Sequence, residues 1–149
     1  MGAKHCFVCG QDNPKGLHIH FDKDGDEVVA HYVCEETHAG WPGVQHGGIT
    51  SALLDEAAAY VPNFMGLTSV TGELNISFKE PIYVGERLEL RAKPIRVHRR
   101  LIEVESWIVG PEGQVKASAR AKMAILNDAK VARLGIDNSE LQDMQSETR

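Results

Sequence analysis

The sequence lacks any apolar run close to the roughly 18 residues that a membrane-spanning helix requires. Its first ten residues, MGAKHCFVCG, lack the apolar core of a secretory signal peptide. An excess of basic residues is also missing, because 16 Lys and Arg stand against 21 Asp and Glu, a formal net charge of −5. A chain with this balance is not built to coat nucleic acid or an anionic membrane. We therefore expect a cytoplasmic protein with no nucleic-acid or membrane partner.

Cysteine is scarce, and its count is odd. Cys6, Cys9 and Cys34 cannot all pair within one chain, so we expect reduced thiols. Cys6 and Cys9 have the spacing of half a structural zinc site, but no second Cys-x2-Cys or His-x3-His pair follows, and His5 directly adjoins Cys6. The pair also does not open a helix after a strand, as a redox-active pair would. The sequence therefore predicts neither a metal site nor a redox cofactor.

The chain length of 149 residues fits one domain, and a hydrophobic fraction of 42% can supply its core. Residues 1–16 have the composition of a loop, and glycine and proline mark another loop over 34–45. The hydrophobic periodicity predicts a strand over 26–33, a helix over 46–61 that Pro62 ends, and strands near 73–79, 87–92, 101–109 and 115–125. We expect the domain to span residues 1–127, followed by a polar tail over 128–149 in which a short helix can form.

The expected helix is rich in Ala and Leu and is apolar on most of its faces, which indicates that it is enclosed on several sides. The strands that follow are spaced for hairpins and alternate in polarity. The apolar faces carry Leu74, Ile76 and Phe78 in one strand and Val115, Ala117, Ala119, Ala121, Met123 and Ile125 in the last, opposite Lys116, Ser118, Arg120 and Lys122. These features predict an α+β domain in which one curved antiparallel sheet wraps around one helix. The edges of such a sheet favour pairing with a second copy of the chain.

Short motifs are spread along most of the chain. The central ones are residues 41–49 (WPGVQHGGI), 53–57 (LLDEA), 71–74 (TGEL) and 78–81 (FKEP), and residues 6–17 (CFVCGQDNPKGL) and 117–121 (ASARA) add to them. Together they resemble the hotdog-fold acyl-CoA thioesterases of the phenylacetate-pathway type, over about residues 6–126. The resemblance implies a hotdog fold and thioester hydrolysis without a cofactor. We expect a homodimer, or a homotetramer built as a dimer of dimers, that acts on an acyl-CoA.

Gly47 and Gly48 come where the expected helix begins, so their N–H groups have no acceptor within the helix. Glycine lets a substrate approach the backbone closely, and the helix N-terminus adds partial positive charge. A thioester carbonyl placed there would be polarised as in an oxyanion hole, an interaction worth about 3–4 kcal/mol in other enzymes. A Gly-rich turn without chemistry is the alternative. His46 could bind the carbonyl or, equally, cap the helix.

Asp55 is the exception in an otherwise apolar helix. A partly desolvated carboxylate is more basic than usual, so Asp55 could activate water as a general base or attack the thioester and form an anhydride. The alternative is an aspartate turned to solvent beside Glu56. Thr71 opens the next strand, where its hydroxyl could orient Asp55 or the water, or simply favour the strand. We expect Glu73 to be a structural partner rather than a second catalytic acid.

Gly47 and Asp55 are eight residues apart on one helix, about 12 Å along its axis. One carbonyl cannot lie near both groups in the same chain. A second copy with an antiparallel helix brings Gly47 of one subunit to Asp55 of the partner subunit. The spacing therefore predicts a two-fold dimer with two composite sites, which the resemblance also implies.

A local basic run consists of Arg96, His98, Arg99 and Arg100 at an expected strand turn. Coenzyme A carries phosphates, which Arg96, Arg99 and Arg100 could hold. A solvated hairpin is the alternative.

The acyl group would need an apolar pocket. Tyr60, Phe64 and Met65, near the end of the expected helix, could line one, or they could be core or dimer contacts. Asn13 and His38 are candidate substrate-binding residues by loop position and by analogy with the family alone.

Two other functions fit the same fold. The resemblance implies that a hotdog hydratase or dehydratase has a His paired with an acid early on the helix, but the residue fourteen after His38 is Ala52, and no Asp–His pair precedes the helix. A module that binds an acyl- or aromatic-CoA without turnover is the second alternative, since a fold and a pocket do not prove catalysis. The presence of Asp55, Thr71 and both glycines favours the thioesterase. The sequence does not identify the acyl group.

Overall fold

The computed structural model describes residues 3–137. Its elements, in chain order, are β1 (Asp22–Asp24), β2 (Glu27–Val33), a short 3-10 helix η1 (Glu36–His38), α1 (Gly47–Phe64), β3 (Thr68–Phe78), β4 (Arg87–Val97), β5 (Leu101–Val109), β6 (Val115–Leu126) and α2 (Asp128–Leu134). No helix in this part of the chain has the length and apolar character needed to cross a membrane.

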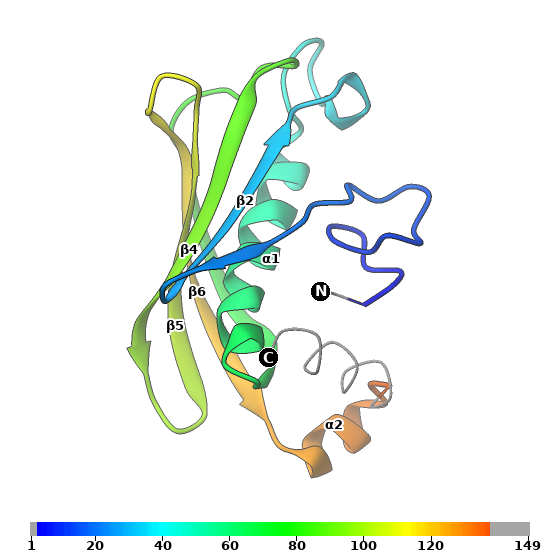
Figure 1. The fold of residues 1–149 in the computed structure, drawn as a ribbon, viewed down its shortest axis with the longest axis vertical. Coiled ribbons are helices and arrows are strands. Elements are labelled where there is room, and N and C mark those ends of the chain that lie inside the picture. Colours follow the sequence, from blue (N-terminus) through cyan, green and yellow to red (C-terminus); the bar gives the residue numbers. More distant parts are fainter. Residues whose placement is uncertain (1–2, 138–149) are drawn as a thin grey trace.

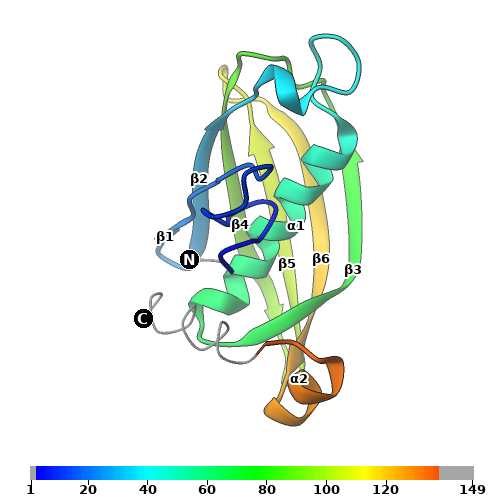
Figure 2. The ribbon, with the colours of Figure 1, turned by 90° about the vertical axis from the view of Figure 1, so that its right-hand side faces the viewer.

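The six strands form one sheet in the order β1-β2-β4-β5-β6-β3, and every neighbouring pair is antiparallel. Figures 1 and 2 show that this sheet curves around α1, which lies against its concave face. The same views place the N-terminal segment, residues 3–21, on the side of α1 that faces away from the sheet. The α+β hotdog architecture predicted from the sequence is therefore confirmed.

The core forms where α1 meets the sheet. Leu53, Leu54, Ala57 and Ala58 of the helix are at most 1% exposed. The sheet opposes them with Val28, Ala30, Leu88, Leu90, Ala92, Ile102, Val104, Ile108, Ala117, Ala119, Ala121 and Met123, all buried. Val8, Cys9, Ile19 and Phe21 close the same cluster from the N-terminal segment. A helix without a polar face is stable in water only when it is covered in this way on several sides.

Pro62 does not end α1, contrary to the expectation from the sequence, because the helix continues to Phe64. A proline inside a helix removes the hydrogen bond that its own N–H would make. Pro62 lies in the last turn, however, and its carbonyl still accepts from the N–H groups of Met65 and Leu67. The helix therefore loses one hydrogen bond and ends two residues later.

The short helix expected in the polar tail is present as α2. The Asn127 side chain caps it by accepting a hydrogen bond of 2.9 Å from the N–H of Lys130, and Gly135, at φ +70°, ends it. Val131 is 2% exposed, which anchors α2 to the domain. Residues 138–149 of the expected tail lie outside the described residues.

Lys116 departs from the predicted strand pattern. The alternation in β6 predicts a polar face for it, but its side chain is only 4% exposed. The pairing of β5 with β6 shifts between Ile108 and Val109, so Lys116 is the extra residue of a β-bulge and turns inward. Its Nζ lies 3.2 Å from Glu86 Oε1 and donates to the Pro81 carbonyl at 2.9 Å. The buried Lys116 ammonium group therefore has both a charged partner and a hydrogen-bond acceptor.

Replacing Lys116 by alanine should lower the free energy of unfolding by about 3 kcal/mol, because Glu86 would remain partly buried without its cation and the Pro81 carbonyl without its donor. Lys122 is the matched control. Its ion pair with Glu73 is about half exposed on both sides, so Lys122→Ala should change this free energy by less than about 0.5 kcal/mol. Urea unfolding followed by circular dichroism measures both variants. Equal losses in the two would contradict a stabilising role for the buried pair.

Candidate active site

The N-terminus of α1 presents one free backbone donor. His46 caps the helix, because its Nδ1 accepts a hydrogen bond of 2.8 Å from the Gly48 N–H. Of the two N–H groups expected to be free, that of Gly48 is therefore occupied. Within residues 3–137 the Gly47 N–H has no hydrogen-bond acceptor, and Gly47 is exposed. The helix thus offers the Gly47 N–H, together with the partial positive charge of its N-terminus, to a ligand.

A groove of about 320 Å³ opens beside Gly47. It is lined by Val44, Gln45, Gly47, Thr50, Phe78, Lys79, Glu80, Pro81, Ile82 and Ala117. The alternation over 73–79 predicts a buried Phe78, but this side chain is 61% exposed. The Phe78 ring lies beside Gly47, and a Cβ added to Gly47 would be 3.6 Å from it. Phe78 therefore forms an aromatic wall that sequence reasoning did not assign to the site.

Asp55 and Thr71 meet where α1 faces the edge strand β3. The Thr71 hydroxyl donates to Asp55 Oδ1 at 2.6 Å, with Asp55 half-buried and Thr71 exposed. The register between β3 and β6 shifts between Thr71 and Glu73, which leaves Gly72 as the extra residue of a bulge. Beyond the bulge, Glu73 pairs with Lys122 on β6 at 3.1 Å. The structure therefore joins Thr71, and not Glu73, to Asp55.

The two candidates chosen by analogy have partners in their own loops. His38 Nδ1 accepts from the Glu35 N–H at 3.2 Å, and the His38 carbonyl accepts from the His46 N–H at 2.8 Å. Asn13 donates to the His5 carbonyl at 3.2 Å, inside the N-terminal segment. His38 thus shapes the turn in front of α1, and Asn13 shapes the segment that covers the helix.

The three candidates for an acyl pocket lie near the C-terminal end of α1, about 20 to 27 Å along its axis from Gly47. Tyr60 is 3% exposed and stacks on Phe21 of the N-terminal segment, with ring centres 4.4 Å apart. Phe64 contacts the edge of Tyr60 and, with Met65, lines a hollow of about 370 Å³ beside β1 and β2. The structure therefore places Tyr60 in the core and does not bring these three residues to the Gly47 groove.

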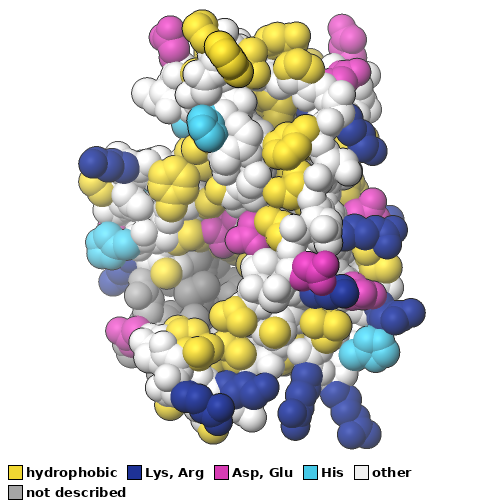
Figure 3. All heavy atoms as spheres, turned by 180° about the vertical axis from the view of Figure 1, so that it is seen from behind, with side chains coloured by type: hydrophobic (Ala, Val, Ile, Leu, Met, Phe, Trp, Pro, Cys, Tyr) yellow, Lys and Arg dark blue, Asp and Glu magenta, His cyan; other side chains and the backbone are white. Residues whose placement is uncertain are grey.

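The basic run lies where β4 turns into β5. Arg96, Arg99 and Arg100 are exposed there, and Arg96 Nε lies 3.7 Å from Glu103. Figure 3 shows Lys and Arg side chains gathered along the lower end of the molecule, the end that carries the β4–β5 hairpin and α2 in Figure 1. This end presents a solvated basic surface.

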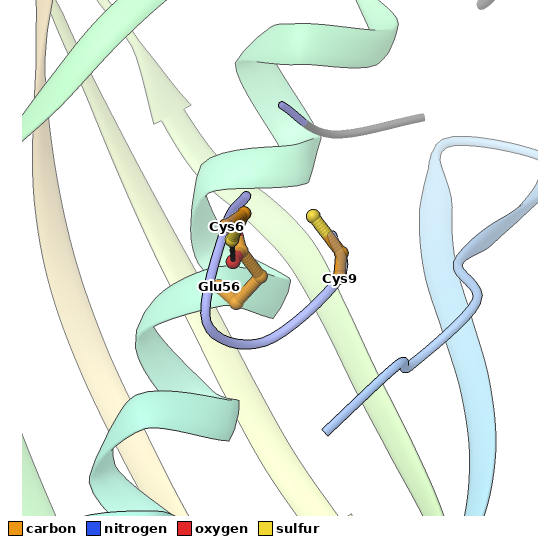
Figure 4. A group of neighbouring side chains, drawn as sticks. All are labelled: Cys6, Cys9 and Glu56. Atoms are coloured by element: carbon orange, nitrogen blue, oxygen red, sulfur yellow. Dashed lines mark hydrogen bonds between the residues drawn. The ribbon is translucent and has the colours of Figure 1, made fainter. Parts of the chain in front are cut away.

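A second cluster, around Glu56, escaped sequence reasoning. Glu56 follows Asp55 in α1, and its side chain meets Cys6 and Cys9 of the N-terminal segment (Figure 4). Cys6 Sγ and Glu56 Oε2 form a hydrogen bond of 2.7 Å. Burial raises the pKa of Glu56 to about 9, and a hydrogen bond with the Cys9 thiol lowers the pKa of Cys6 to about 5. The Cys-x2-Cys spacing is a sequence signal for this cluster, but it does not reveal the partner on α1.

Comparison with known sequences gives one family match. The sequence model of the thioesterase superfamily matches residues 42–117, about half of the chain. A curated protein of Deinococcus radiodurans, named as an esterase, is 40% identical over 79 residues. That match covers 50% of this chain and 51% of the other, so the chain spans about half the length of the curated relative.

Solved structures share the fold. A thioesterase superfamily protein has a TM-score of 0.77 at 24% identity, over 81% of this chain and 63% of that one. A hypothetical thioesterase protein of Streptococcus pneumoniae, solved with coenzyme A, has a TM-score of 0.70 at 21% identity, over 73% and 86%. The Escherichia coli PaaI protein of the phenylacetic acid degradation operon has a TM-score of 0.70 at 24% identity, over 74% and 81%. At these identities the likeness establishes the fold.

Replacing His46 by alanine should lower the free energy of unfolding by about 1 kcal/mol, because the Gly48 N–H loses its acceptor. His46→Asn is the matched control, since asparagine is among the best N-cap residues and should retain most of the stability. Thermal unfolding followed by circular dichroism compares the two. Alanine and asparagine variants of equal stability would show that the cap does not stabilise α1.

Proposed function

The chain belongs to the thioesterase superfamily, and from this premise we propose that it hydrolyses an acyl-CoA thioester to the free acid and coenzyme A. The observation that carries the proposal is the hydrogen bond of 2.6 Å between Thr71 Oγ1 and Asp55 Oδ1. The coenzyme A in the Streptococcus pneumoniae structure supports the substrate class. Two variants of that protein replace an aspartate and a threonine by alanine, and these positions are separated by the same 16 residues as Asp55 and Thr71.

In this proposal Asp55 is the general base. The Thr71 hydroxyl holds Oδ1, which leaves Oδ2 to take a proton from a water molecule. The water oxygen bonds to the thioester carbon as its proton passes to Asp55, and the carbonyl electron pair moves onto oxygen. The C–S bond then breaks, the carbonyl re-forms, and the proton on Asp55 passes to the coenzyme A sulfur. In the other route, Asp55 attacks the thioester carbon directly, releases coenzyme A and forms an anhydride, which water then hydrolyses.

The developing oxyanion is assigned to the Gly47 N–H. The Gly48 N–H already donates to His46, so each chain offers only one of the two donors that the sequence predicts. The partial positive charge at the start of α1 adds to this donor, since both point at the same carbonyl oxygen. Phe78 covers one side of the groove and limits the approach of water to it.

We propose that a second copy of the chain completes the site. Gly47 and Asp55 are fixed about 12 Å apart along α1, so one thioester cannot reach both in one chain. In an antiparallel pair of α1 helices, Gly47 of one subunit and Asp55 of the partner subunit face the same carbonyl. Among the described strands, β3 lies at the edge of the sheet and pairs with β6 alone, and Thr71 is exposed on it, which leaves this side of the described domain open to a partner. The two-fold symmetry produces two equivalent sites.

The exposed arginines of the β4–β5 hairpin are the candidates for the phosphates of coenzyme A. A guanidinium group matches the geometry of a phosphate and binds it through two parallel hydrogen bonds. Membership of the superfamily favours hydrolysis over hydration, dehydration or binding without turnover.

Asp55→Asn should lower kcat for acyl-CoA hydrolysis by at least about 100-fold, because the isosteric amide cannot accept the proton. Thr71→Val should lower it by about tenfold, since it removes one hydrogen bond to the carboxylate. Thiol release from short, medium and aromatic acyl-CoAs measures both effects. Glu73→Gln is the control and should remain active, because Glu73 is bonded to Asn75 and Lys122 instead. Undiminished turnover by Asp55→Asn, or none by the wild type on any of these substrates, would refute the proposal.

Mixing two inactive variants should restore activity if the site is shared. Asp55→Ala lacks the base, and Gly47→Pro lacks the free N–H. Proline is tolerated at the first helical position, and the extended backbone of His46, φ −61° and ψ 134°, is the conformation that a residue before proline favours. Half of the randomly exchanged dimers would be mixed, each with one intact site, so about a quarter of wild-type activity should return. No recovery despite demonstrated subunit exchange would place both groups in one chain.

A further inference from the structure

The side chains of Cys6, Cys9 and Glu56 bring three potential metal ligands together. One ligand atom of each lies within 4.8 Å of the other two. Figure 4 shows the two cysteines on one turn of the N-terminal segment, with Glu56 reaching them from α1. Cys9 is 2% exposed, and Cys6 and Glu56 are half-buried. The proposed hydrolysis uses none of the three.

The turn that carries the cysteines has a well-defined backbone. The Gly10 N–H donates to the Cys6 carbonyl at 2.9 Å, which closes the turn. A Cβ at Gly10 would lie 2.4 Å from the Cys6 nitrogen, so the turn accepts only glycine there. The closed turn and the tight packing at Gly10 therefore fix the backbone that carries Cys6 and Cys9.

We propose that Cys6, Cys9 and Glu56 bind one thiophilic divalent cation, for which Zn²⁺ is the natural candidate. Two cysteine sulfurs with one carboxylate are a donor set that suits zinc and does not suit magnesium or calcium. A sulfur and an oxygen on a tetrahedral zinc ion lie about 3.5 Å apart, so the 2.7 Å contact between Cys6 and Glu56 would open by about 1 Å on binding. Within residues 3–137 no fourth His, Cys, Asp or Glu atom joins the set, which leaves the fourth position to water.

A cation at this place would join two parts of the chain that are distant in sequence, since Cys6 and Glu56 are 50 residues apart. It would fix the N-terminal segment on the face of α1 that the sheet does not cover. Glu56 directly follows Asp55, so the same helical turn would be held by the metal site on one side and by Thr71 on the other. The proposal does not depend on hydrolysis, and its test therefore needs no substrate.

Cobalt(II), a spectroscopic substitute for zinc, is the probe. The full-length chain is reduced and kept anaerobic, so that Cys6 and Cys9 cannot form a disulfide, and is titrated with cobalt chloride and then with zinc chloride. We expect one equivalent of cobalt per chain and a thiolate-to-cobalt charge-transfer band that zinc removes. Glu56→Cys adds a third thiolate and should raise the intensity of that band per cobalt by about half.

Single substitutions identify the ligands. Cys6→Ser should weaken cobalt binding by at least about 100-fold, and Glu56→Gln, which is isosteric and preserves the packing, by at least about tenfold. Cys34→Ala is the matched control, because Cys34 is a buried free cysteine outside the cluster, and it should leave the titration unchanged. Circular dichroism establishes that each variant is folded. The proposal fails if the reduced wild type shows no charge-transfer band, if the band is as strong in Cys6→Ser and Glu56→Gln, or if Cys34→Ala abolishes it.

Discussion

The apolar character of α1 is the constraint on which the rest of the structure depends. Leu53, Leu54, Ala57 and Ala58 are almost fully buried, and no continuous face of the helix is polar. Because apolar surface is driven out of water, the sheet has to curve around one side of the helix and the N-terminal segment has to close the other. Phe21 stacks on Tyr60 in that second layer. The N-terminal segment is therefore part of the core, although it contains no helix and no strand before β1.

Two acidic residues, Asp55 and Glu56, lie in this apolar helix, and their side chains point to different parts of the chain. Successive residues of an α-helix point about 100° apart. Asp55 accordingly reaches Thr71 on β3, while Glu56 reaches Cys6 in the N-terminal segment. Burial raises the pKa of Glu56 to about 9, so this side chain takes up a proton more readily than an exposed carboxylate does. One helical turn can therefore support two separate polar sites inside an apolar layer.

Sequence periodicity predicts an element correctly when the pattern of buried and exposed residues is set within that strand or helix alone. The strand expected over 101–109 coincides with β5, and the enclosed helix follows from its composition. Periodicity fails where a feature depends on what lies opposite. Lys116 turns inward because a bulge adds one residue to β6, and Phe78 is exposed beside Gly47 on the edge strand β3. The pairing of Cys6 with Glu56 links two distant segments and needs the fold itself.

The rigidity of α1 decides how its two catalytic candidates can cooperate. Gly47 and Asp55 are held by one continuous run of helical hydrogen bonds, so no loop movement can bring them to the same carbonyl. A second helix related by a two-fold axis removes this obstacle, and the axis must then pass near Ser51, the midpoint between the two residues. Ser51 and Ala52 are small and half-buried, and the Ser51 hydroxyl is bonded to the Gly47 carbonyl at 2.7 Å, which draws it back along the helix. Small side chains at a crossing point allow two helices to approach closely. The proposed dimer would therefore bring the two α1 helices together at Ser51 and Ala52, where the small side chains leave room for the partner helix.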